Sequence, residues 1–375
     1  MTKILIICDT FKIGGIERLA LDQAYFLKAS NIDCALMVLN APSNLQDHSF
    51  IKNEVGLIND LKVEIFTIYG SRLNQFFQLK KHFIDHGVEK VISHSLRATV
   101  LLRVLRSVLK FSVKNFDIST TIHQLPSLSS SQQAFKRLIY AQFTDQLHVF
   151  SEAARQDWSK KFNNNLFIRI FINRKKISLC RNGVFLPRLP INDHKLDNRN
   201  FELKRIVFIG RLTKWKGLDT FLNLAQNFEE FLDIRILIIS PQDPKEFIES
   251  LEKKTLERVE VIIGKSISQI DFEFGDLHLY PADYGDSSEF KEGVSINVLE
   301  MSCIGVPSLI PKGSNLTWPE LADIGIIKEV DWDNRQSLIT AIDEIKSQKS
   351  PRIIPKSRKV IDIEHNLETM LNYMK

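Results

Sequence analysis

The sequence has few cysteines, glycines and prolines, and it has no long apolar segment. Four cysteines in 375 residues, without Cys-x-x-Cys or Cys/His spacing, argue against a disulfide framework or a structural metal centre, so we expect buried thiols in a reducing cytosol. The 15 glycines and 12 prolines are too few for a linker-dominated chain. No stretch approaches the ~20 apolar residues of a membrane span, and the run Ile4–Cys8 is too short for a signal peptide. These shortages predict a cytoplasmic protein, associated at most peripherally with the inner face of the cell membrane.

Several functional motifs are also missing. The sequence has no Walker loop (Gly-x4-Gly-Lys-Ser/Thr) and no Gly-x-Gly-x-x-Gly, so it offers no anchor for an ATPase or a dinucleotide-binding enzyme. It has no recognised nucleic-acid-binding module, and its aromatic residues lie mostly in apolar runs. We therefore expect no nucleic-acid partner.

The charge is unevenly distributed. Residues 1–190 contain 26 lysines and arginines against 14 acidic residues, whereas residues 191–375 contain 24 against 31, and the net charge of +5 hides this difference. Such asymmetry raises the question of what the basic half contacts. Two basic clusters are Arg103, Arg106, Lys110 and Lys114 on one helical face, and Arg169 with Arg174–Lys176. A basic amphipathic helix can lie on an anionic membrane surface, but the solvated face of an ordinary packed helix explains the first cluster equally well.

Short apolar, β-branched runs alternate with helical patterns along the chain. Examples are Ile4–Cys8 and Lys90–Ser93 in the first half, and Arg205–Ile209 and Val259–Ile263 in the second, where the last predicted run is Ser308–Ile310. Strands of this length separated by helices predict βαβ units and parallel sheets.

This alternation stops at a stretch rich in proline, Asn and Asp and then starts again, which indicates two domains. We predict an α/β fold of two doubly wound, Rossmann-like domains that face each other across a cleft. The predicted divisions are an acceptor-side domain at 1–187, a linker at 188–200, a nucleotide-binding domain at 201–355, and a helix within 356–375 that packs back toward the first domain.

One candidate binding segment follows the first strand of the second half. The strand ends at Gly210, a short cationic loop follows, and a helix begins near Gly217. Arg211 and Lys216 then lie beside a helix N-terminus, whose free N–H groups favour anions. Two cations at that place suit a diphosphate, although a solvated basic loop is the alternative.

A second candidate segment is a glycine-containing turn before a later helix. The backbone N–H groups of Gly293, Val294 and Ser295 would point into whatever site precedes the helix. Glu300 is eight residues after Glu292 and so returns to nearly the same helical face. Two carboxylates there could accept hydrogen bonds from sugar hydroxyls, or they could simply be a first-turn and a solvent-facing glutamate.

These segments occur in an order that resembles a known family. In chain order they are Gly14-Gly15-Ile16-Glu17 after the first strand, Gly210-Arg211 with Lys216-Gly217, and Glu292-x7-Glu300 followed by Gly305-Val306-Pro307. Together they resemble the retaining glycosyltransferases of family 4, which have the GT-B fold, and the resemblance covers nearly the whole chain. His123, after the predicted strand Ile118–Ile122, resembles the histidine that follows the fifth strand in that family.

The resemblance implies a reaction and a role for each charged residue. A hexose or N-acetylhexosamine would move, with retention, from a UDP- or GDP-linked donor to a growing surface polysaccharide or lipid-linked oligosaccharide. Arg211 and Lys216 would hold the diphosphate, Glu292 the donor sugar and Glu300 the ribose hydroxyls, while His123 would line the transfer site. The resemblance also assigns backbone contacts with the nucleotide sugar to Gly14, Gly15, Gly210, Gly293, Val294 and Ser295.

The resemblance implies no cofactor and no metal ion, because Arg211 and Lys216 would neutralise the diphosphate. Asp331-Trp332-Asp333 spells the Asp-x-Asp of metal-using glycosyltransferases, but it precedes a predicted helix, and we interpret Asp333 as the N-cap of that helix. The partners expected from the resemblance are the donor and a saccharide or lipid-diphosphate-linked acceptor. The basic clusters of the first half add an anionic membrane surface as a partner of the first domain.

Two other functions stay open. A non-catalytic nucleotide-sugar-binding subunit would keep the diphosphate loop and lose a sugar contact. A sugar-nucleotide epimerase of the same fold would need a full acid/base set in the cleft, for which the sequence shows no candidate.

Overall fold

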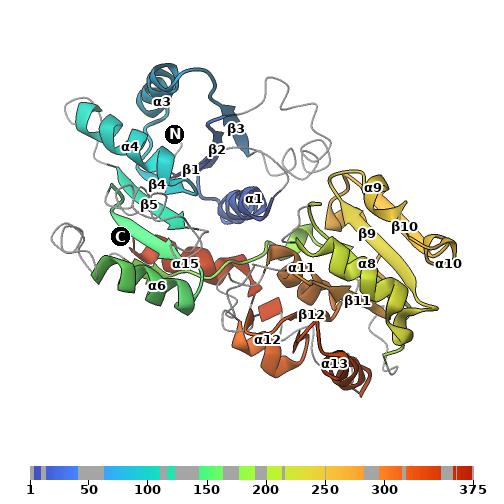
Figure 1. Cartoon of the computed structure of the whole chain (residues 1–375). Coiled ribbons are helices and arrows are strands. Elements are labelled where there is room, and N and C mark those ends of the chain that lie inside the picture. Colours follow the sequence, from blue (N-terminus) through green and yellow to red (C-terminus); the bar gives the residue numbers. More distant parts are fainter. Residues whose placement is uncertain are drawn as a thin grey trace. The chain divides into compact units, whose positions relative to one another are not determined.

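The chain folds into two compact units, shown in Figure 1. The first comprises Met1–Phe185 and Ile363–Lys375, and the second comprises Leu186–Asp362. The structure, a computed structural model, describes residues 4–9, 14–40, 63–109, 116–122, 143–163, 177–190, 201–212, 216–249, 251–282, 295–314, 318–347, 358–359 and 361–373.

The first unit contains a parallel sheet of seven strands in the order β3-β2-β1-β4-β5-β6-β7. Its strands are β1 (Ile4–Cys8), β2 (Cys34–Val38), β3 (Glu64–Thr67), β4 (Lys90–Ser93), β5 (Asp117–Ile122), β6 (Gln146–Val149) and β7 (Ile177–Leu179). Its described helices are α1 (Gly15–Ala29), α3 (Arg72–His86), α4 (Leu96–Leu109), α6 (Glu152–Asn163) and α15 (Ile363–Tyr373).

The second unit contains a parallel sheet of six strands in the order β10-β9-β8-β11-β12-β13. Its strands are β8 (Arg205–Ile209), β9 (Arg235–Ser240), β10 (Val259–Ile263), β11 (Asp276–Leu279), β12 (Ser308–Pro311) and β13 (Ile327–Val330). Its described α-helices are α8 (Leu218–Asn227), α9 (Lys245–Ile248), α10 (Lys253–Leu256), α11 (Ile296–Ile304), α12 (Pro319–Ile324) and α13 (Arg335–Ser347).

Both sheets are doubly wound, which confirms the predicted α/β architecture. In each sheet the order runs outward in both directions from a central strand, β1 in the first and β8 in the second. All five residues of each central strand are buried, as expected for a parallel strand covered on both faces.

The last helix belongs to the first unit. Ile363, Leu367 and Met370 of α15 are part of the apolar cluster that also contains buried side chains of α1 and β1. Gln23 of α1 donates from Nε2 to the Met370 sulfur at 3.7 Å. The start of the second unit, Leu186–Arg188, is a short 3-10 turn within the segment between the two sheets.

Two expectations from the composition concern the burial of the thiols and the length and apolarity of the helices. All four cysteines are free and buried, as predicted, and burial raises the pKa of Cys34 to about 12. Within the described residues, no helix combines the length and apolarity needed to cross a membrane.

Two predictions about charged side chains are wrong. Arg106 does not belong to a solvent-facing basic stripe, because its guanidinium binds the Asp145 carboxylate and donates to the Phe116 carbonyl at 3.0 Å. Asp333 is not the N-cap of α13, because Asn334 Oδ1 accepts hydrogen bonds from two backbone N–H groups of the first turn, at 3.0 and 3.2 Å. Other predicted features lie outside the described residues: Lys110, Lys114, Arg169 and Arg174–Lys176.

Candidate functional site

The candidate site of the second unit lies where its strand order reverses. β9 adjoins β8 on one side and β11 adjoins it on the other. Crossover connections leave such neighbouring strands in opposite directions, so a crevice opens beyond their carboxyl ends, where ligands bind in doubly wound folds. The segments that leave β8 and β11 at this edge carry Arg211, Lys216 and Tyr280.

The loop after β8 depends on one glycine. Gly217 has a φ of 75° and a ψ of 30°, the left-handed conformation that favours glycine, and α8 begins at the next residue. A Cβ atom at Gly217 would lie 1.9 Å from the carbonyl oxygen of Pro281, just after β11. Gly210 differs, because a Cβ atom there would meet its nearest neighbours at 3.6 and 3.7 Å. Gly217 therefore allows the loop to pass against the end of the neighbouring strand.

Lys216 is held in place by Tyr280. Its Nζ atom donates to the Tyr280 hydroxyl at 2.9 Å and lies 4.8 Å from the centroid of the phenol ring. Only 3% of Tyr280 is exposed, so its ring is fixed at the end of β11. An ammonium group has three N–H donors, so Lys216 can keep this bond and still donate to a phosphate.

A buried histidine of β11, close enough to Lys216 to feel its charge, has a lowered pKa. His278 of β11 is fully buried, and its Nδ1 lies 3.0 Å from the hydroxyl of Ser308. Burial, followed by the positive charge of Lys216, lowers the pKa of His278 to about 3. The positive charge at this strand end therefore belongs to Lys216 and not to the histidine.

The start of α11 is attached to the same edge of the sheet. Asn297, in the first turn, donates from Nδ2 to the carbonyl of Ile209 at the end of β8, at 3.0 Å. Ser295 is the residue immediately before the helix, which begins one residue later than the sequence pattern predicts. This arrangement places the helix that carries Glu300 directly against the strand that leads to Arg211.

Glu300 is buried with a partner that the sequence patterns did not indicate. Its side chain is 3% exposed, and its carboxylate binds the guanidinium of Arg188, which is 0% exposed. Arg188 lies in the 3-10 turn that begins the second unit. The ribose contact of Glu300 stays a prediction, and any ligand of this carboxylate would share it with Arg188.

Four of the predicted site residues lie outside the described part of the chain: His123, Glu292, Gly293 and Val294. Their roles stay predictions.

The first unit has a cluster of polar side chains near the carboxyl edge of its own sheet. Gly14 has extended backbone with a φ of −164°, and α1 begins at Gly15. Gln23 of α1 is fully buried, and its Oε1 lies 2.7 Å from Nε2 of His94, which follows β4. Arg18, one turn after Gly14, is 7% exposed. Polar side chains at Arg18, Asp22 and Gln23 on the buried face of α1 are the sequence signal that would have indicated this group.

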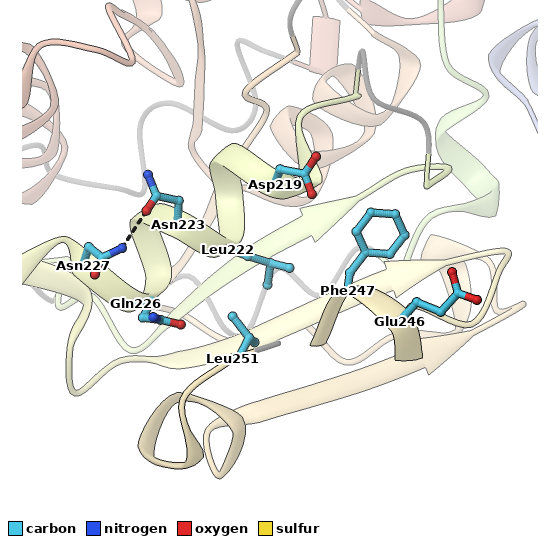
Figure 2. Close-up of a pocket in the computed structure, with 8 residues that line it drawn as sticks. All are labelled: Asp219, Leu222, Asn223, Gln226, Asn227, Glu246, Phe247 and Leu251. Carbon is cyan, nitrogen blue, oxygen red and sulfur yellow. Dashed lines mark hydrogen bonds between the residues drawn. The ribbon is translucent and has the colours of Figure 1, made fainter. Parts of the chain in front are cut away.

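A separate hollow lies along α8 in the second unit. It has a volume of about 330 Å³. Figure 2 shows Leu222 and Leu251 among the residues that line it, with Asn223, Gln226 and Asn227 along α8. Asn227 Nδ2 donates to Asn223 Oδ1 at 2.6 Å, so part of its polar edge is bonded within the helix. None of the site residues predicted from the sequence lines it. Within the described ranges, no group of His, Cys, Asp or Glu side chains has the arrangement needed to hold a metal ion.

Comparisons with known proteins relate this geometry to other chains. No family model matches the sequence. An uncharacterized glycosyltransferase of Methanocaldococcus jannaschii is 24% identical over 164 residues, which are 42% of this chain and 40% of that protein's length.

Solved structures match over the whole chain. The HepE protein of Anabaena, in complex with UDP and glucose, aligns with 99% of each chain at a TM-score of 0.67 and 13% identity. The lipopolysaccharide outer core galactosyltransferase WaaB, without ligand, aligns with 100% of this chain and 99% of its own at a TM-score of 0.62 and 12% identity. Two doubly wound parallel α/β units and these alignments show that the chain has the GT-B fold.

Proposed function

We propose that the chain is a retaining glycosyltransferase that moves a hexose or N-acetylhexosamine from a nucleotide-diphosphate sugar to a polysaccharide or lipid-linked oligosaccharide acceptor. The single observation that carries this proposal is the position of Lys216, fixed by Tyr280 at the carboxyl edge of the second sheet, beside the start of α8. A fixed cation next to the free N–H groups of a helix start is suited to the diphosphate of such a donor. The fold and the UDP complex of HepE support the same ligand class.

The proposed chemistry follows from charge development. As the bond between the sugar C1 and the diphosphate oxygen breaks, the electron pair stays on the diphosphate, which becomes more negative. Lys216 and the neighbouring Arg211 would stabilise that charge, and cations preorganised in this way supply a large part of catalysis. The acceptor hydroxyl would form the new bond to C1 on the face that the diphosphate leaves, and its proton would pass to the departing diphosphate oxygen.

The basic first half fits an acceptor held at an anionic surface. Residues 1–190 carry 26 basic against 14 acidic residues. The proposed function therefore includes contact of the first unit with anionic lipid, near a lipid-diphosphate-linked acceptor.

The test is release of nucleoside diphosphate from a panel of UDP- and GDP-linked sugars. Thermal shift first identifies the donor, since a ligand at ~100 times its dissociation constant adds ~2.7 kcal/mol of stability. With that donor, we expect Lys216→Ala to lower the rate of release by about 10²–10³-fold. Tyr280→Phe, which keeps the ring and removes the bonded hydroxyl, should have a smaller effect. Lys245→Ala, an exposed lysine on α9, is the matched control and should match the wild type.

Equal release by Lys216→Ala and the wild-type protein would remove the assigned role of Lys216. Donor binding by the wild type without any release or transfer would instead identify a non-catalytic nucleotide-sugar-binding subunit.

A further inference from the structure

The first unit exposes an unusual concentration of large apolar side chains. Among the described residues, eight large apolar side chains are exposed, and six of them lie on or next to α3 and α4. We call this surface the α3–α4 face; its apolar residues are Tyr69, Leu73, Phe77, Ile84, Val104 and Val108, which are 48–66% exposed. Scattered exposed apolar residues are normal, but a gathered set marks an interaction surface.

The two helices form one surface. α3 and α4 contact each other, and Figure 1 shows them next to one another in the first unit. Both pack inward on the same apolar cluster, α3 through Leu79 and Phe83, and α4 through Leu102 and Leu105. Since both helices cover the same part of the core, their outward sides share one face of the unit.

α3 has two apolar sides where packing on a sheet requires only one. At about 100° per residue, Leu73, Phe77 and Ile84 fall within about 40° of one another. The buried Leu79 and Phe83 lie on a different side of the helix. Core packing therefore accounts for the inner side only, and the outer apolar stripe needs another partner.

Two lysines border this stripe, and other basic residues lie on the same two helices. Lys80 and Lys81 border it on its two sides, and Arg72 lies in the first turn of α3. Arg97 lies in the first turn of α4, which contains no acidic residue, and Asp85 is the one acidic residue of α3. Exposed apolar side chains bordered by lysines and arginines are typical of helices that lie in the interface of an anionic bilayer.

We propose that the α3–α4 face docks the protein on an anionic lipid surface. The apolar side chains enter the boundary between headgroups and acyl chains, and the lysines contact lipid phosphates. A second copy of this chain fits less well, because a symmetric contact would bring two basic borders together. The proposal specifies the lipid contact within the proposed function, and its test measures lipid binding without turnover, so each can fail separately.

The experiment is cosedimentation of the full chain with vesicles of 70% phosphatidylcholine and 30% phosphatidylglycerol, against pure phosphatidylcholine, at low salt. We expect the wild type to bind the anionic vesicles preferentially. Lys80→Gln with Lys81→Gln should weaken binding on the order of thirtyfold, at about fivefold for each charge. Leu73→Ser with Phe77→Ser should weaken it at least tenfold, and this loss should persist at high salt.

Matched controls come from the second unit. Leu256 and Ile263 are the other two of the eight exposed large apolar residues in the described ranges, and Lys253 and Lys254 form an adjacent lysine pair in α10. Leu256→Ser with Ile263→Ser, and separately Lys253→Gln with Lys254→Gln, should each change vesicle binding less than twofold. Circular dichroism and melting temperature check that every variant is folded.

Insertion is read directly from a labelled cysteine. Because the four native thiols are buried, Phe77→Cys can be labelled selectively with an environment-sensitive fluorophore. Its emission should shift to the blue on anionic vesicles, whereas the same label on Leu256→Cys should not shift.

Three outcomes would overturn the proposal. The first is no binding of the wild type to anionic vesicles at low salt. The second is unchanged binding when the α3–α4 face is altered. The third is a dimer in solution that Leu73→Ser with Phe77→Ser converts to a monomer, which would identify the face as a contact between two copies.

Discussion

Replacement of Gly217 by alanine tests how the diphosphate loop is built. A left-handed conformation costs a residue with a Cβ atom roughly 1–2 kcal/mol. The added Cβ would also lie 1.9 Å from the Pro281 carbonyl oxygen, and it needs at least 3.0 Å, so loop and strand end must separate by about 1.1 Å. Overpacking of this kind costs about 1–3 kcal/mol. We therefore expect Gly217→Ala to lower the free energy of unfolding of the second unit by about 2–5 kcal/mol.

Gly210→Ala is the matched control at the other end of the same loop. Its Cβ atom meets no neighbour closer than 3.6 Å, so stability should stay within ~0.5 kcal/mol of the wild type. Urea unfolding and calorimetry measure the difference in stability between the two variants, which corresponds to about 4–20 °C in melting temperature for a unit of this size. UDP binding should fall with Gly217→Ala, because Pro281 follows Tyr280, which holds Lys216. If Gly217→Ala melts with the wild type, the close approach described here is refuted.

Two further predictions concern stability. The guanidinium of buried Arg205 donates to both carboxylate oxygens of Asp276, at 2.7 and 2.8 Å. Asp276→Ala removes this partner and should lower the free energy of unfolding of the second unit by about 3–5 kcal/mol. Glu229→Gln, in the exposed pair with Arg335, should cost less than about 1 kcal/mol, and similar urea midpoints for the two variants would contradict this. In the folded protein, burial lowers the pKa of His82, His148 and His278 from the ordinary 6.5 to about 3–4. The unfolded chain therefore binds more protons than the folded one at acidic pH. The free energy of unfolding should be at its full value above pH 6.5, and each histidine should lower it by up to ~1.4 kcal/mol per pH unit as the pH drops toward 4. Urea midpoints at pH 7.5 and 5.0 measure this loss, His148→Phe should reduce the difference, and an unchanged midpoint at pH 5.0 would argue against neutral buried imidazoles.

Continuous apolar runs predicted the interior strands well. Ile4–Cys8 and Arg205–Ile209 were predicted with the bounds that the structure shows, and so was Val259–Ile263, although β10 lies at an edge of its sheet. β13 was not predicted, because the sequence Ile-Lys-Glu-Val has only two apolar residues, and the two charged residues between them are only partly buried.

The candidate site was predicted only in part, since a sequence pattern gives a residue's position but not its partner. Lys216 was predicted as a site residue because it lies in the loop between a strand and a helix. Its contact with Tyr280 depends on β8 and β11 being neighbours, although 64 residues separate the two side chains. Arg106 shows the same limit, because helical spacing placed it on a basic face, whereas Asp145, 39 residues later, binds it.

The chain enters the first unit twice, and this arrangement bears on how it folds during synthesis. The second unit, Leu186–Asp362, is contiguous, so all its strands can pair as soon as it has left the ribosome. The first unit must wait, because Ile363, Leu367 and Met370 of α15 complete the cluster around α1. The unit whose strands are translated first is therefore the one whose core closes last, and until then the side of α1 that packs on α15 stays exposed.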